Sequence, residues 1–170
     1  MTTTTAILSL TRALQGQVEE ALAALEESQA HAPEIKIFNT STATTALGTL
    51  YLLAGKLDEA QEAAMRAAER AAKHGFRGSQ ARVSYLLGEI CARRDPSDVQ
   101  QAEANYREAM ALAEDLGMRP LAAQCHLGLG MLYRQMDNHK STNKHLIRET
   151  VQRSRAMDMP YRLKHAERAC

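Results

Sequence analysis

The run Leu129-Gly130-Met131-Leu132-Tyr133 decides the fold, because it recurs along the chain. A Leu-Gly pair followed three residues later by an aromatic residue also occurs as Leu47-Gly48-Thr49-Leu50-Tyr51. A third copy is Leu87-Gly88-Glu89-Ile90-Cys91, in which a thiol replaces the aromatic ring. The glycines of successive copies lie 40 and 42 residues apart. A nearly fixed period of this length indicates an array of like helical units, each of which buries its apolar face against its neighbours.

The composition favours an all-α protein. The chain of 170 residues is rich in Ala, Leu, Glu, Gln, Arg and Met, has no Trp and is 4% aromatic. Most of these residues are strong helix formers. Hydrophobic residues make up 45% of the chain and charged residues 24%, which is ordinary for a soluble globular domain.

Apolar residues at helical spacing, interrupted by Gly and Pro, predict four helical hairpins and a short final helix. Gly16, Gly55, Gly75 and Gly117 end helices, and Gly55 is expected to adopt a left-handed cap. The chain is expected to be one domain with units at 2–31, 35–74, 77–117 and 119–157 and a tail at 158–170. The expected helices are 2–14, 18–30, 35–54, 57–73, 77–93, 98–116, 119–135, 140–156 and 160–169.

These residues resemble tetratricopeptide repeats, in which Leu-Gly and an aromatic residue are followed by a small, a bulky and a small residue. The resemblance implies a right-handed α-solenoid. Several positions depart from the pattern: Ala64 stands where a bulky residue is usual, and Thr142 and Glu149 replace small residues. The first unit matches only in its second half. The matching second-helix positions are Ala21, Leu25 and Ser28, then Ala60 and Ala67, then Ala102, Tyr106 and Ala109, and finally Leu146.

The stretch from Ala113 to Arg134 resembles a narrower group. Similar repeats form the C-terminal region of bacterial signalling proteins that join a class III nucleotide cyclase domain to a signalling ATPase, and they occur in large bacterial transcriptional activators. This resemblance implies a regulatory part of a bacterial signalling system. Nothing in the sequence resembles the cyclase or ATPase domains, so neither activity is expected of this chain.

The resemblance also implies a concave groove lined by the first helix of each hairpin. Arg82, Tyr85 and Arg93 are the best candidates for holding an acidic or C-terminal peptide segment. The Lys and Asn with which some such repeats clamp chaperone tails are absent here. The candidate partner-binding residues are Thr45, Thr49, Arg82, Tyr85, Glu89, Arg93, Gln124, Leu127, Met131 and Arg134.

No pattern predicts catalysis, a cofactor or a metal. Adjacent helical residues point about 100° apart, so Cys125 and His126 are interpreted as a core thiol beside a surface histidine. Gly128 and Gly130 are interpreted as helix-packing glycines, because no strand precedes them. His139 and His145 lack a third ligand for a metal.

Charge, cysteine content and hydropathy favour a cytoplasmic protein without a membrane span. The three widely spaced cysteines indicate reduced thiols. The formal charge is −3 over residues 1–75, zero over 76–136 and +4 over 137–170. The basic residues near the end of the chain are not interleaved with aromatic residues, so nucleic-acid binding is not expected.

Three functions are compatible with these patterns. The favoured one is a scaffold that binds a protein or peptide partner in the groove. The first alternative is a self-assembling module, because helix 2–14 exposes Ile7, Leu8 and Leu10. The second alternative is a small-molecule sensor.

Overall fold

The computed structural model describes residues 2–30, 37–94 and 98–136, which form helices and connecting turns without a strand. The all-α prediction is confirmed for these residues, and the helix bounds agree with those expected to within a few residues. The predicted helices 140–156 and 160–169 lie outside the described residues. The helices are α1 (Thr2–Leu14), α2 (Val18–Ala30), α3 (Ile37–Leu53), α4 (Leu57–Lys73), α5 (Arg77–Arg94), α6 (Val99–Asp115) and α7 (Arg119–Met136).

Four of the turns between helices share one construction. Each has a glycine with positive φ, between 65° at Gly75 and Gly117 and 92° at Gly16. The residue after the glycine donates its N–H to a carbonyl five residues earlier, as in Lys56 N to Tyr51 O at 2.9 Å. This left-handed cap needs glycine, because a Cβ atom disfavours the conformation. The predicted left-handed cap at Gly55 is confirmed, with φ of 77°.

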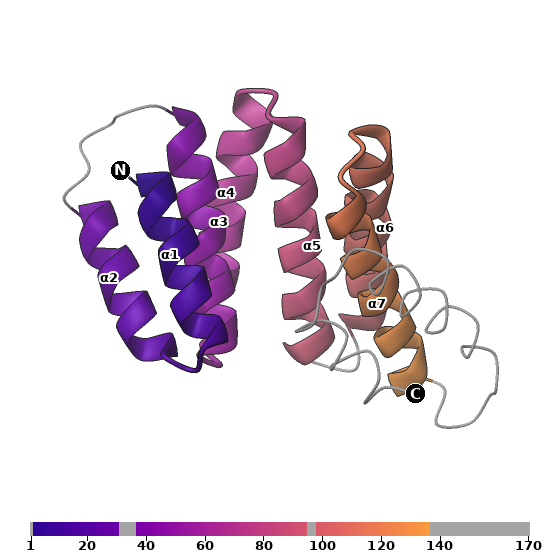
Figure 1. Ribbon diagram of the computed structural model, residues 1–170. Coiled ribbons are helices and arrows are strands. Elements are labelled where there is room, and N and C mark those ends of the chain that lie inside the picture. Colours follow the sequence, from indigo (N-terminus) through magenta and orange to yellow (C-terminus); the bar gives the residue numbers. More distant parts are fainter. Residues whose placement is uncertain (1, 31–36, 95–97, 137–170) are drawn as a thin grey trace.

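The helices stand side by side in a row that runs from α1 and α2 at one end to α6 and α7 at the other (Figure 1). Each helix packs against the next one along the chain. In addition α1 contacts α3, α3 contacts α5, and α5 contacts α7. The four odd-numbered helices therefore form one continuous layer. Within the described ranges, α2, α4 and α6 do not pack against one another in this way. Each of them packs instead against its odd-numbered neighbours.

Small residues allow the close packing between hairpins. Five alanines of α4 are fully buried: Ala60, Ala63, Ala64, Ala67 and Ala71. A Cβ atom on Gly48 would lie only 2.8 Å from Leu86 Cδ2, so α3 and α5 approach closely at this glycine.

At least one polar side-chain contact joins each hairpin to the preceding one. Tyr51 of α3 donates its hydroxyl to Glu26 of α2 at 2.6 Å. Arg94 of α5 pairs with Asp58 of α4 at 2.6 Å. Tyr133 of α7 hydrogen bonds to Glu103 of α6. These contacts are exposed or partly exposed, so each is expected to add little stability.

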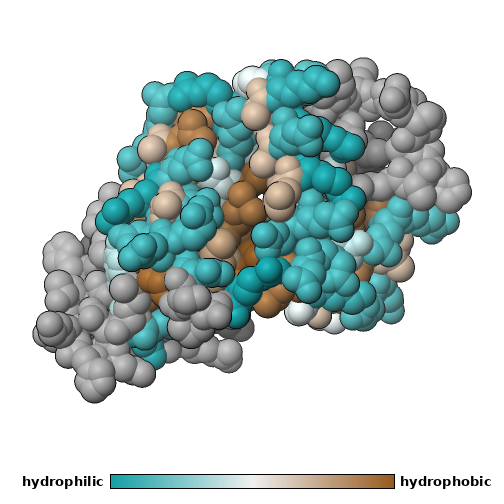
Figure 2. Space-filling view, turned by 180° about the vertical axis from the view of Figure 1, so that it is seen from behind, coloured by the Kyte–Doolittle hydropathy of each residue, from teal (hydrophilic) through white to brown (hydrophobic). Residues whose placement is uncertain are grey.

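Seen from behind, the surface is largely hydrophilic, and hydrophobic residues show mainly towards the middle of the face (Figure 2). None of the helices in the described part of the chain has both the length and the apolar content that a membrane crossing requires.

Candidate partner-binding face

The candidate site is built on α5, where four of the predicted residues follow one another at helical spacing. Arg82, Tyr85, Glu89 and Arg93 lie three or four residues apart, so they form one stripe along the helix. Arg82 and Arg93 are exposed, Tyr85 is half-buried and Glu89 is buried. The stripe therefore has an exposed cation towards each end and a buried polar centre.

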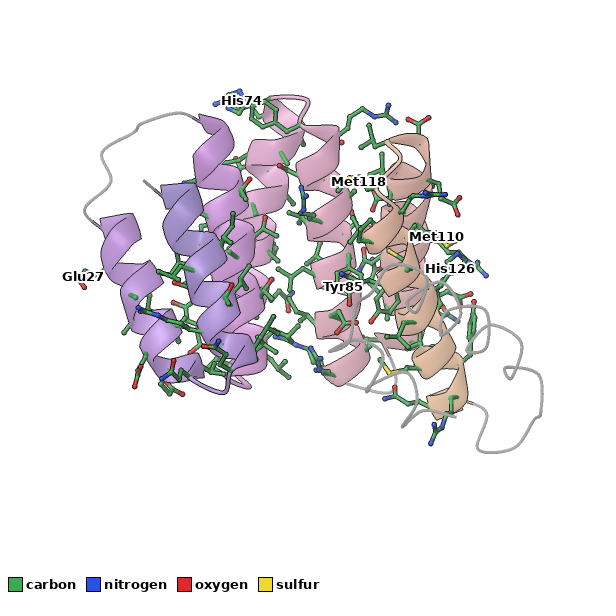
Figure 3. The ribbon with its side chains drawn as sticks, viewed as in Figure 1. Glu27, His74, Tyr85, Met110, Met118 and His126 are labelled. Carbon is green, nitrogen blue, oxygen red and sulfur yellow. The ribbon has the colours of Figure 1, made fainter. Side chains whose placement is uncertain are left out.

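Glu89 is the centre of a hydrogen-bond network. Its Oε1 accepts the hydroxyl of Tyr85 at 3.1 Å and that of Tyr106 at 2.9 Å. Its Oε2 pairs with Arg93 Nη2 at 3.1 Å. Both oxygens are thus satisfied although the residue is only 8% exposed, which avoids the cost of a buried unpaired charge. Figure 3 shows Tyr85 in the space between α5 and the pair α6 and α7.

Tyr106 connects α6 to both odd-numbered neighbours. Its ring lies 5.9 Å from that of Tyr85, centroid to centroid. A Cβ atom on Gly88 would come within 2.9 Å of this ring, and one on Gly128 within 2.6 Å. The ring therefore fills a notch between a glycine of α5 and a glycine of α7. Burial, and then the charge of Glu89, raise the pKa of the Tyr106 hydroxyl, so it remains a proton donor to Glu89.

The other predicted residues lie on the neighbouring helices α3 and α7, where most of them are buried or half-buried. Thr45 is buried, and Thr49 donates its hydroxyl to the Thr45 carbonyl at 3.0 Å. On α7, Leu127 is buried, whereas the other three predicted residues are half-buried or exposed: Gln124, Met131 and Arg134. Thr45, Glu89 and Leu127 contribute to packing in the isolated chain, and their role as partner contacts stays a prediction.

The thiol and imidazole groups lie apart from this stripe or are inaccessible. Cys125 is fully buried, and burial raises its pKa to about 12, so it is a core thiol as predicted. His126 is half-buried, with Nε2 4.0 Å from Glu114 Oε1. His74 lies at the α4–α5 turn, away from Tyr85 and His126 (Figure 3). Within the described part of the chain, no three His, Cys, Asp or Glu side chains are grouped to hold a metal. His139, His145 and Cys170 lie outside it.

Tyr106 also belongs to the site, through its hydrogen bond to Glu89. The repeat pattern predicted it only as a bulky residue of a second helix. One signal was available: a buried tyrosine hydroxyl requires a polar partner, and Glu89 is the only acidic residue between Arg77 and Arg94.

The comparisons with known proteins do not add to this picture. Neither a protein-family model nor a curated protein sequence matches the chain.

Proposed function

We propose that the chain is a protein–protein interaction module whose partner binds along the face of the odd-numbered helices. The observation that carries this proposal is the α5 stripe, on which Arg82 and Arg93 are exposed on either side of Tyr85. Arginine and tyrosine supply much of the binding energy at protein interfaces, because they combine apolar area with directional hydrogen bonds.

The way in which this stripe is held supports the proposal. Glu89 binds both Tyr85 and Arg93, so these side chains are partly ordered before any partner arrives. Ordering a side chain in advance reduces the entropy that binding costs. Arg93 donates from Nη2 to Glu89 Oε2, and its side chain is 47% exposed, so the guanidinium has further donors to offer a partner.

The wider role follows from the same proposal. Contacts between successive odd-numbered helices are the arrangement that a solenoid of tetratricopeptide-like hairpins has on its concave side. A right-handed solenoid, a regulatory role in bacterial signalling and a cytoplasmic location are parts of this proposal. We also propose that the chain binds its partner and catalyses no reaction itself.

Site-specific photo-crosslinking tests the proposed function. A photoreactive amino acid at position 82 of α5 is expected to capture a partner, whereas the same group at Arg66, an exposed residue of α4, is expected to capture none. The captured protein is identified and purified, and its binding is measured again with the Arg82→Ala/Tyr85→Ala variant. Unchanged binding by that variant, in a protein with normal helix content, would reject the α5 stripe as the site.

Self-association is the second candidate function, and an exposed apolar surface favours it. Ile7 of α1 is 62% exposed, and Leu8 and Leu14 are each 51% exposed. Ile7 and Leu14 are seven residues apart and so lie on one face of α1, which two copies would bury at once in an isologous pair. An Ile7→Glu/Leu14→Glu variant is expected to lower the mass measured by light scattering at high concentration. A native chain that is monomeric under those conditions would reject this candidate.

A further inference from the structure

The helices of the described structure divide their charges between the two layers. The odd-numbered helices α1, α3, α5 and α7 carry seven arginines and a single acidic residue, the buried Glu89. The even-numbered helices α2, α4 and α6 carry twelve acidic and four basic residues. The formal charge of the whole chain, +1, conceals this division, since it sums over both sets of helices and all other residues. The division becomes visible only when the contacts assign each helix to a layer.

Two of the seven arginines define the accessible positive surface on α5. Arg77 pairs with Asp115 of α6 at 2.7 Å, and Arg94 pairs with Asp58 of α4 at 2.6 Å, so both are directed to the even-numbered layer. Arg82 forms no ion pair within the described part of the chain. Arg93 pairs with Glu89 of its own helix at 3.1 Å, but its side chain is 47% exposed. Arg82 and Arg93 are therefore the two exposed cations on the stripe that contains Tyr85.

The spacing of these two cations sets the geometry of a ligand. Arg82 and Arg93 are separated by three turns of α5, which corresponds to ~16 Å along the helix axis. An extended peptide covers this distance in about four to five residues. Side chains four residues apart in an extended segment point to the same side, so two carboxylates at that spacing can reach both guanidinium groups.

Resting on the proposed function, we infer that the partner presents an extended acidic segment, with carboxylates about four residues apart, which lies along α5 between Arg82 and Arg93. Charge complementarity commits the face to an anionic ligand. A protein segment fits better than a nucleic acid because the cations are few and discrete. The acidic even-numbered layer also repels a long polyanion.

The test uses the full-length chain and short fluorescein-labelled peptides in a Gly-Ser background, measured by fluorescence anisotropy. One peptide carries two glutamate pairs four residues apart, and a second has the same composition with its four glutamates contiguous. A single-stranded RNA of similar charge is the third probe. Titrations are made at ~0.01 M salt, where the Debye length is about 30 Å, and at ~0.15 M, where it is about 8 Å.

The spaced peptide is expected to bind most tightly, and its affinity is expected to fall with salt. Arg82→Glu is expected to weaken this binding by roughly three- to ten-fold, the effect of replacing one exposed ion pair by a repulsion. The matched control Arg66→Glu, on α4, is expected to leave it unchanged. Because Arg82 and Arg66 are both exposed, neither variant is expected to change the helix content seen by circular dichroism.

Three results would overturn the inference: equal binding of both peptides, equal effects of Arg82→Glu and Arg66→Glu, or tighter binding of RNA than of the spaced peptide. These failures are distinguishable from failure of the proposed function. A partner that is captured through position 82 but lacks an acidic segment refutes only the inference about charge. Capture at position 66 instead refutes the proposed function as well.

Discussion

The substitution Gly128→Ala tests the close packing of α7 against Tyr106 in the candidate site. An added Cβ atom would lie 2.6 Å from Tyr106 Cε1 and 2.7 Å from Cζ, so the ring or a helix must move. The ring has little room to move, because Gly88 of α5 also lies close to it and Glu89 accepts a hydrogen bond from its hydroxyl.

The expected loss of stability follows from two opposing effects. Overpacking a tight core costs about 1–3 kcal/mol, and we expect a value near the upper end for a ring that two helices approach closely. Replacing glycine by alanine within a helix returns up to ~1 kcal/mol. The net loss is therefore about 2 kcal/mol, which lowers the melting temperature by roughly 4–8 °C for a chain of this size.

Thermal unfolding followed by circular dichroism measures this loss, and three further variants assign its cause. Gly78→Ala, at a helical glycine of α5, meets only Met118 Sδ at 3.9 Å and is expected to be neutral or slightly stabilising. In a Tyr106→Leu background, which lacks the clashing ring atoms, Gly128→Ala is expected to cost nothing. In a Tyr106→Phe background, which keeps the ring, it is expected to cost as much as in the native chain. An equal cost in the Leu and Phe backgrounds would refute the assignment of the clash to the ring of Tyr106.

Three further predictions concern single groups. Cys125 is expected to react with a thiol reagent only on unfolding, and faster labelling of Cys125 than of the half-buried Cys91 in a Cys170→Ser protein would contradict its burial. Glu89→Gln is expected to lower the unfolding free energy by about 1–3 kcal/mol, because it removes the buried carboxylate that Tyr106 and Arg93 bind. Denaturant titration measures this loss, and an unchanged midpoint would contradict the hydrogen-bond network. Burial and the hydrogen bond to Glu26 raise the pKa of Tyr51 to about 12, so its contribution is complete below the unfolded value of 10.0 and is lost as pH rises from there through 12. Stability measured over this range is expected to decline less in Tyr51→Phe, and parallel curves for the two proteins would contradict that coupling.

The helices were predictable from the sequence because their determinants are local. Apolar residues at a period of 3.6 mark each buried stripe, and glycines such as Gly55 and Gly117 end helices where only a positive φ closes the turn. Gly128 was interpreted as a helix-packing glycine, and an added Cβ atom there would lie 2.6 Å from Tyr106 of α6.

The network in the candidate site was not predictable, because it depends on the rotation of one helix against another. Sequence spacing placed Glu89 on the same stripe as Arg82 and Arg93, but only the packing of α6 brings the Tyr106 hydroxyl to it. The burial of Glu89 follows from that packing. The division of charge between layers was equally hidden, because it requires knowing that α1, α3, α5 and α7 contact one another.

The most direct test of binding along α5 is the position of a bound peptide on the chain. Amide chemical shifts of the isotope-labelled chain, titrated with the spaced acidic peptide or with a captured partner segment, give that position residue by residue. We expect the shift changes to be concentrated on α5 around Arg82, Tyr85 and Arg93, with smaller changes on α3 and α7. Shifts concentrated on the acidic helices α2, α4 and α6 would contradict it.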